Sequence, residues 1–249
     1  MTTSPIPEHL QIAFIGGGNM ASAILGGLVR QGMAPDRIRV VEPFAETRAR
    51  LQQEFGVQVL EAADASLAEA DVVVWAVKPQ QFEEATRPVA GHVRQALHLS
   101  VAAGIPASAL TRWLGTERLV RAMPNTPALV GQGMTGLFAG AGASAQDRAV
   151  IDALLAPTGQ RMWLEQEALI DSLMAISGSG PAYVFYFIEA LVRGGVELGL
   201  TAEQSKTLAA QTFAGAAARW AGVDCRFRCS PISSASPPDR VWPLAVSAP

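Results

Sequence analysis

A glycine-rich turn near the start of the chain is the feature that most restricts how the chain can fold. The turn reads Gly16-Gly17-Gly18-Asn19-Met20-Ala21 and lies between an apolar run, residues 11–15, and a helix-forming stretch. Gly16 permits a tight turn, Gly18 lets the backbone approach a pyrophosphate, and Ala21 keeps the helix close to the strand. The first turn of such a helix offers free N–H groups to phosphates. The pattern predicts a dinucleotide-binding strand-turn-helix unit, with an ordinary glycine-rich turn as the alternative.

Short β-forming runs alternate with helical patterns as far as about residue 165. Residues 72–77, Val-Val-Val-Trp-Ala-Val, are apolar at every position, which is typical of a strand buried on both faces of a parallel sheet. The alternation predicts an α/β fold with a doubly wound, mostly parallel Rossmann sheet. The expected strands are residues 11–16, 37–42, 57–60, 72–77, 97–103 and 119–123, with 134–139 and 161–164 as added edge strands; the expected helices include 21–31, 45–55 and 81–93.

The character of the sequence changes after Leu164, where helix formers replace β-forming runs. One helix is expected to end at Ile176, a second to run from Pro181 to about Gly199, and a third to begin after a cap at Thr201. The second helix is apolar on more than one face, which indicates a partner subunit; the residues concerned are Tyr183, Phe185, Phe187 and Leu191. We therefore expect a dinucleotide-binding domain at residues 1–164, a helical domain at 165–218 and a Pro/Ser-rich tail at 219–249.

Composition excludes several classes of partner. Charged residues make up 16% of the chain, and the formal net charge is −3 without a dense basic cluster, so we expect no nucleic-acid partner. The stretch closest to a membrane span, residues 181–200, carries Glu189, Arg193 and Glu197, so we expect no membrane partner. Residues 1–10 lack the pattern of a secretory signal. The two cysteines, Cys225 and Cys229, lie in the last segment, which predicts a cytoplasmic protein with no metal site.

Glu42 ends the second expected strand. An acidic side chain at that position can bond a ribose 2′-hydroxyl and repel a 2′-phosphate, so Glu42 alone favours NADH over NADPH. Arg48 and Arg50 follow shortly afterwards and can offset its charge. A solvated strand end is the alternative interpretation of Glu42.

Three later strand ends carry further candidates, because ligands bind at the carboxyl ends of strands in an open α/β sheet. Lys78, within Val77-Lys78-Pro79, either reaches a ligand or is a surface lysine. The small residues Ala102, Ala103 and Gly104 leave room for a nicotinamide ring. Asn125 and Thr126 lie between two prolines, in a stiff loop that either aims polar groups into the crevice or is a plain rigid turn.

Four motifs occur in order along the chain: Ile15-Gly16-Gly17-Gly18-Asn19-Met20-Ala21, Ala76-Val77-Lys78-Pro79, Arg121-Ala122-Met123-Pro124-Asn125-Thr126-Pro127-Ala128 and Ser177-Gly178-Ser179-Gly180-Pro181-Ala182-Tyr183. Together they resemble the pyrroline-5-carboxylate reductase family, over roughly residues 10 to 218. The resemblance implies hydride transfer from a nicotinamide to the C=N bond of 1-pyrroline-5-carboxylate, which yields L-proline. It also implies NADPH as the usual cofactor, with NADH left open by Glu42, and a homodimer or larger homo-oligomer.

By this resemblance Asn19, Met20, Ala76, Lys78 and Asn125 line the cofactor side. The full set of expected cofactor-binding residues is Ile15, Gly16, Gly17, Gly18, Asn19, Met20, Ala21, Glu42, Ala76, Val77, Lys78, Pro79, Ala102, Ala103, Gly104 and Asn125.

The carboxylate of the substrate needs a site of its own. Ser177, Gly178, Ser179, Gly180 and Pro181 are the best candidates, because Pro181 suits a first helical position and the residues before it expose N–H groups and hydroxyls. Plain N-capping by Ser179 is the alternative. No catalytic acid, base or nucleophile is expected, because a protonated imine is already a good hydride acceptor that needs mainly orientation. His9, His92 and His98 are scattered and are interpreted as structural or surface residues.

The end of the chain departs from the family pattern. Relatives continue the helical domain with a Ser-Pro-Gly-Gly-Thr-Thr-like loop and two further helices, whereas Cys229-Ser230-Pro231-Ile232 is followed here by Ser233 and Ser234. A reading-frame shift near codon 219 is the first explanation, and divergence into a pseudoenzyme is the second. We expect cofactor binding to survive and substrate binding, dimerisation and turnover to be weakened or lost. The alternatives to a reductase of this type are a dinucleotide-binding regulator and a related β-hydroxyacid or imine reductase.

Overall fold

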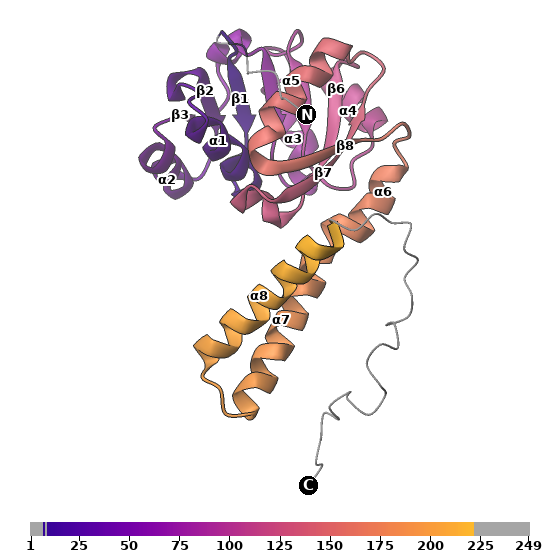
Figure 1. The fold of residues 1–249 in the computed structure, drawn as a ribbon. Helices are drawn as coiled ribbons and strands as arrows, with labels where there is room; N and C mark the ends of the chain where they lie inside the picture. Colours follow the sequence, from indigo (N-terminus) through magenta and orange to yellow (C-terminus); the bar gives the residue numbers. More distant parts are fainter. Residues whose placement is uncertain (1–6, 8, 222–249) are drawn as a thin grey trace. The chain divides into compact units, whose positions relative to one another are not determined.

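The computed structural model describes Pro7 and residues 9–221, and the proposed features of the tail beyond Ala221, including Cys225 and Cys229, lie outside this range. The chain divides into two compact units between Tyr183 and Val184. The first unit is built on one eight-stranded sheet with the strand order β3-β2-β1-β4-β5-β6-β7-β8 (Figure 1). Its strands are β1 (Ile12–Ile15), β2 (Ile38–Val41), β3 (Gln58–Leu60), β4 (Val72–Trp75), β5 (Leu97–Ser100), β6 (Leu119–Met123), β7 (Gly133–Ala139) and β8 (Gly159–Trp163).

All strand pairs are parallel except β6 with β7, which confirms the predicted doubly wound, mostly parallel sheet. The two late runs do extend the sheet, with β8 at its edge. Two strands end at least two residues earlier than expected, because the chain leaves its neighbours at the carboxyl edge: β4 stops at Trp75, two residues early, and β5 at Ser100, three residues early.

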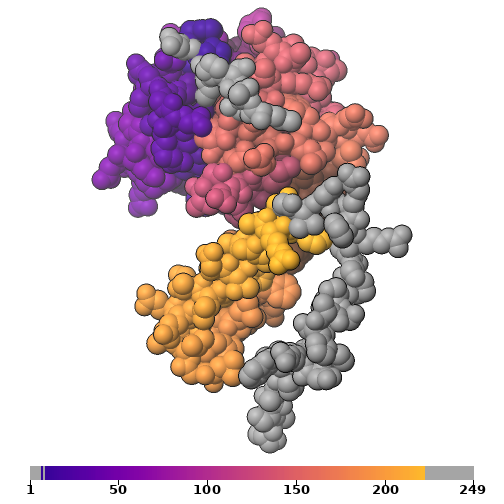
Figure 2. Space-filling view, viewed as in Figure 1, coloured from indigo at the N-terminus to yellow at the C-terminus, as the bar shows by residue number. Residues whose placement is uncertain are grey.

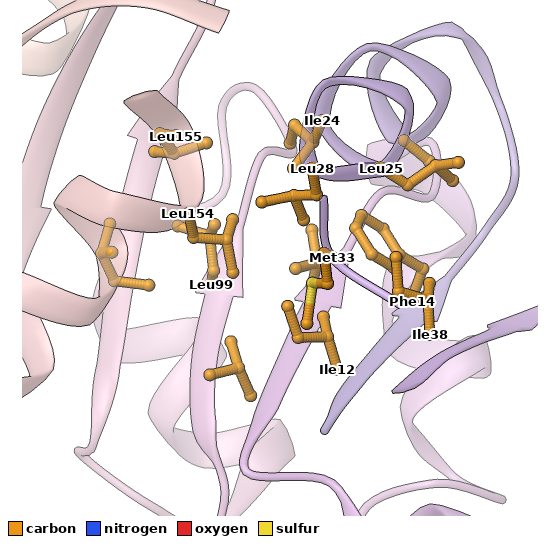
Figure 3. Close-up of a cluster of buried hydrophobic side chains, with 14 of the residues drawn as sticks. Ile12, Phe14, Ile24, Leu25, Leu28, Met33, Ile38, Leu99, Leu154 and Leu155 are labelled. Atoms are coloured by element: carbon orange, nitrogen blue, oxygen red, sulfur yellow. The ribbon is translucent and has the colours of Figure 1, made fainter. Parts of the chain in front are cut away.

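Both faces of the sheet are buried, and successive side chains of one strand point to opposite faces. On β1, Ile12 and Phe14 join one hydrophobic cluster, while Ala13 and Ile15 join the other. The first cluster includes Ile24, Leu25 and Leu28 on one side and Leu154 and Leu155 on another (Figure 3). This double burial explains why residues 72–77 are apolar throughout.

The helices of the first unit are α1 (Asn19–Arg30), α2 (Ala45–Phe55), α3 (Phe82–Thr86), α4 (Ala107–Leu114), α5 (Ala145–Leu155) and α6 (Leu169–Leu173). The helix predicted for residues 45–55 is confirmed. The helix predicted for residues 81–93 is wrong in length, because α3 ends at Thr86. Pro88 lacks an N–H and disfavours helical backbone at the residue before it, so the helix stops short of it.

A widened turn joins α6 to the next helix. Residues Met174–Gly178 form a π-helical turn, and α7 (Gly180–Glu197) begins after Ser179 alone. The chain therefore stays helical where the sequence predicted one helix ending at Ile176 and a separate one starting at Pro181. π-Helical turns are frequent at functional sites.

The second unit consists of α7 from Val184 onward and α8 (Ala202–Ala221), which lie side by side as an antiparallel pair (Figures 1 and 2). Thr201 caps α8 as predicted: its Oγ1 accepts from the Gln204 N–H at 3.1 Å, and Gln204 Oε1 accepts from the Thr201 N–H at 2.9 Å. Large apolar side chains of this helical pair are exposed, as the sequence predicted; they include Phe185, Tyr186, Phe187, Leu191 and Leu208.

His98 makes the stability of the first unit depend on pH. Its ring lies inside the sheet, 1% exposed, and Nδ1 accepts a hydrogen bond from Trp75 Nε1 at 3.0 Å. Burial lowers the pKa of His98 from 6.5 to about 4. The unfolded chain therefore takes up a proton first as the pH falls, and the stabilisation from a neutral His98 is complete above pH 6.5 and lost toward pH 4.

We expect the free energy of unfolding to fall by about 2 kcal/mol between pH 7 and pH 5 through this residue alone. The measurement is urea unfolding at both pH values. In His98→Gln, which keeps an acceptor for Trp75, the pH dependence should be flatter by that amount. An equal pH dependence in both proteins would contradict the assignment.

Candidate dinucleotide site

A cleft of about 770 Å³ lies at the carboxyl ends of β1, β2 and β4. It is lined by nine of the predicted cofactor residues: Ile15, Gly16, Gly17, Gly18, Asn19, Glu42, Ala76, Val77 and Lys78. These residues come from strand ends that are neighbours in the sheet but far apart in the sequence. The structure thus brings together the three segments that the strand pattern assigned to one edge.

The glycine-rich turn has the geometry that a pyrophosphate requires. Gly16 has φ +96°, and a Cβ there would lie 2.6 Å from the Ala76 carbonyl oxygen, so no other residue fits without a shift. Gly18 is the N-cap of α1, makes no side-chain cap, and has no atom within 4 Å of the place where a Cβ would stand. The start of α1 therefore opens onto free space next to donor N–H groups, which suits an anion.

The carboxylate of Glu42 accepts a hydrogen bond from the glycine-rich turn. Its side chain is 6% exposed; Oε2 accepts from the Gly17 N–H at 2.8 Å, and Oε1 accepts from the Phe44 N–H at 3.0 Å. Arg50 also contacts Gly17: its Nη2 donates to the Gly17 carbonyl at 3.1 Å and to Ser22 Oγ at 3.2 Å. Glu42 is therefore a buried part of the cleft wall.

The two arginines that were expected to offset Glu42 are arranged differently. Arg50 lines the cleft. Arg48 donates to the carbonyls of Glu42 at 2.9 Å and Pro43 at 2.7 Å and pairs with Glu61 at 3.0 Å. The ionisable side chains that line the cleft are the carboxylates of Glu42, Glu61 and Glu84 and the cations of Arg50 and Lys78, so its formal charge is slightly negative.

The cleft also contains polar residues that the sequence analysis did not single out. Thr47 comes from α2, Gln81 and Glu84 from the segment around α3, and Glu61 from the end of β3. Their types are ordinary for exposed helix and loop positions. Only Glu61, which directly follows β3, could have been marked by its place at a strand end.

Seven predicted cofactor residues lie outside this cleft. Ala21 is fully buried in the core and Met20 packs against that core, Pro79 opens a single turn after β4, and Ala102 is 7% exposed in the second hydrophobic cluster. Ala103, Gly104 and Asn125 follow β5 and β6, the next strands along the sheet. Their part in binding a cofactor stays a prediction.

The candidate carboxylate segment, residues 177–181, lies in and just after the π-helical turn. The Ser179 N–H donates to the Met174 carbonyl at 2.9 Å, and Ser177 Oγ donates to the Leu173 carbonyl at 3.2 Å, so these two donors are engaged within the helix. A Cβ at Gly178 would lie 3.4 Å from Met123 Cε, which places the segment beside the end of β6. Carboxylate binding by Ser177, Gly178, Ser179, Gly180 and Pro181 stays a prediction.

Pro7 and residues 9–221 contain no group of three or more His, Cys, Asp or Glu side chains that could hold a metal ion. One helical stretch, Leu169–Glu197, is long and apolar enough to cross a membrane by length and composition, and none of its apolar window is buried within the chain.

The fold and the cleft together define a dinucleotide-binding protein of the Rossmann class. Residues 11–104 match the family described as NADP oxidoreductase, coenzyme F420-dependent, and residues 167–224 match the family described as pyrroline-5-carboxylate reductase dimerisation. The pyrroline-5-carboxylate reductase of Pseudomonas aeruginosa is 46% identical over 209 residues, which cover 83% of this chain and 77% of that protein. The chain belongs to the pyrroline-5-carboxylate reductase family.

Solved structures agree with this assignment. The pyrroline-5-carboxylate reductase of Coxiella burnetii superposes with a TM-score of 0.79 at 35% identity, covering 87% of this chain and 81% of that one. The pyrroline carboxylate reductase of Plasmodium falciparum, solved with NADP bound, superposes with a TM-score of 0.77 at 28% identity, covering 87% and 80%.

The glycine turn can be tested with two substitutions that differ in one respect. Gly18→Ala meets no atom of the chain, so its melting temperature should be unchanged, but the new methyl group occupies the space that the pyrophosphate approaches. We expect its affinity for NADPH, measured by fluorescence titration, to fall at least about tenfold. Gly16→Ala should instead lower the melting temperature, because its Cβ meets the Ala76 carbonyl.

Gly91→Ala is the control, since its Cβ also meets open space, and the residue lies outside the helices and strands and does not line the cleft. It should change neither quantity. Unchanged NADPH affinity in Gly18→Ala would contradict a pyrophosphate site at this turn.

Proposed function

We propose that this chain reduces the C=N bond of 1-pyrroline-5-carboxylate to give L-proline, with a nicotinamide dinucleotide held in the cleft. The observation that carries the proposal is the 46% identity to the reductase of Pseudomonas aeruginosa over 209 residues, which are 83% of this chain. When it is bound, the reduced nicotinamide supplies the hydride for this reduction.

The residues present fit such a cofactor. The Gly16 turn and the uncapped start of α1 suit the pyrophosphate, and the open space above Gly18 admits it. Glu42, at the end of β2, suits the adenosine ribose. NADPH is the cofactor we propose from the family, and the buried carboxylate of Glu42 supports acceptance of NADH as well.

The proposed chemistry asks little of the protein beyond position. A protonated cyclic imine accepts hydride readily, so the chain needs to orient the ring and hold its carboxylate near the nicotinamide. Residues 177–181 are proposed for the carboxylate, and Ala102, Ala103 and Gly104 for the backbone beneath the nicotinamide. The ends of β5 and β6 are adjacent in the sheet, and Gly178 lies beside Met123 at the end of β6, which supports this arrangement.

The exposed apolar side chains of α7 and α8 are proposed as a subunit interface. Their segment falls within the match to the dimerisation family at residues 167–224. An interface of this kind also accounts for the apolar stretch Leu169–Glu197 without a membrane. We propose that the chain is cytoplasmic, forms a homodimer or larger homo-oligomer, and has no nucleic-acid partner. The departure from the family pattern beyond residue 218 is proposed to weaken the assembly.

The proposed activity is tested with purified full-length chain. We expect NADPH to be oxidised, followed at 340 nm, only when 1-pyrroline-5-carboxylate is added, with L-proline as the product. A second chain, re-read in another frame after codon 219 to restore the Gly-Gly-Thr loop, should turn over faster. Nucleotide binding without turnover by either chain would instead support a dinucleotide-binding regulator, and turnover of β-hydroxyacids or other imines alone would support a related reductase.

Glu42→Gln tests the choice between the two cofactors. The amide keeps an oxygen that can accept from the Gly17 N–H but removes the charge that repels a 2′-phosphate. The ratio of the NADH to the NADPH dissociation constant, measured by fluorescence titration, should rise about tenfold. Glu61→Gln removes a charge from a more exposed side chain of the same cleft and should change the ratio less. A fall in the ratio for Glu42→Gln would contradict the assignment.

A further inference from the structure

The carbonyl of Ser177 is left without a helical partner. In an α-helix it would accept from the N–H four residues later, but that residue is Pro181, which has none. The next N–H, that of Ala182, donates to the Ser179 carbonyl at 3.1 Å. A half-buried carbonyl at this point needs a donor from elsewhere.

Asn125 supplies that donor across the fold. Its Nδ2 donates to the Ser177 carbonyl at 2.9 Å, and its Oδ1 accepts from the Met134 N–H at 2.9 Å. The amide therefore joins the turn after β6, the beginning of β7 and the helical turn at Ser177. Both ends of its side chain are engaged in these contacts, so Asn125 joins separate parts of the protein, and the cofactor contact predicted from the sequence stays a prediction.

The loop around Asn125 is rigid enough to transmit this contact. Asn125 lies in extended backbone between Pro124 and Thr126-Pro127, and the short turn after it closes with Gly131 at φ +72°. Prolines on both sides limit the conformations that the loop can adopt. The position of Asn125 is thus fixed by the sheet, and the position of Ser177 is fixed by Asn125.

We propose that Asn125 is a positioning residue for the substrate: its amide replaces the hydrogen bond that Pro181 cannot make and so sets residues 177–181 against the ends of β5 and β6. The inference rests on the proposed function, since it assigns Asn125 to the substrate half of that site. It predicts a selective effect, in which loss of the Nδ2 donor weakens substrate binding and leaves NADPH binding intact.

Asn125→Asp tests the donor alone. The variant keeps size and the acceptor for the Met134 N–H but turns a carboxylate oxygen toward the Ser177 carbonyl. We expect KM for 1-pyrroline-5-carboxylate to rise at least about tenfold, with the NADPH dissociation constant changed less than about twofold. Gln132→Glu is the control, because it makes the same change of amide to acid on an exposed side chain nearby. Equal changes in substrate KM and NADPH affinity, or none in either, would overturn the proposal.

Pro181→Ala tests the route of the effect. It restores an N–H that can serve the Ser177 carbonyl, so Asn125→Asp should raise KM by a smaller factor in the Pro181→Ala background than in the wild type. If the two substitutions change KM by independent factors, Asn125 does not act through that carbonyl and the proposal fails.

Hydrogen exchange separates this inference from the proposed function. Peptides covering residues 174–183 should exchange faster in Asn125→Asp than in wild type, whereas peptides from β1 and α1 should not. A wild-type chain without turnover would refute the proposed function, but this exchange pattern would still support the positioning contact. Turnover together with unchanged exchange at residues 174–183 would refute the contact alone.

Discussion

Burial of the parallel sheet on both faces is the constraint on which the rest of this structure depends. The central strands send alternate side chains into two separate hydrophobic clusters, as Ile12 and Phe14 of β1 do on one face and Ala13 and Ile15 on the other. Helices and loops cover both faces, so polar chemistry has no place on them. The segments that line the dinucleotide cleft follow the carboxyl ends of β1, β2, β3 and β4.

The dinucleotide cleft is organised by the protein itself. Gly17 is held through its N–H by the buried Glu42 carboxylate and through its carbonyl by Arg50, so the turn is fixed by contacts on both sides. The adjacent Gly18 position is kept free of side chains. A turn held in this way loses little conformational freedom when an anion binds, which favours affinity. The same residue, Glu42, therefore contributes to the shape of the site and to its charge.

The sequence predicted the strands well because their signal is local: an apolar run bounded by turn residues. It predicted the cleft because strand ends in a parallel sheet meet at one edge. The prediction from the sequence failed where one residue or a distant contact determines the local structure.

The helix at 81–93 was predicted too long because Pro88 was not weighed, and α5 was not singled out although Ser144 and Asp147 form a capping box. The π-helical turn was not predicted, because one widened turn barely alters an apolar pattern. The contact between Asn125 and Ser177 was not predicted, because the two residues are 52 positions apart in the sequence.

The arrangement of the site separates cofactor binding from substrate binding along the chain. All residues that line the dinucleotide cleft lie between Ile15 and Val89, on strands and helices whose packing is complete within the first unit. Residues 177–181 contact the rest of the first unit at Asn125 and Met123, and Gly180 and Pro181 begin α7, which carries the exposed apolar side chains. The proposed substrate segment therefore shares a helix with the proposed subunit interface, whereas the glycine turn does not. The dinucleotide cleft thus depends on the sheet, and the proposed substrate segment depends on both the sheet and the proposed subunit interface.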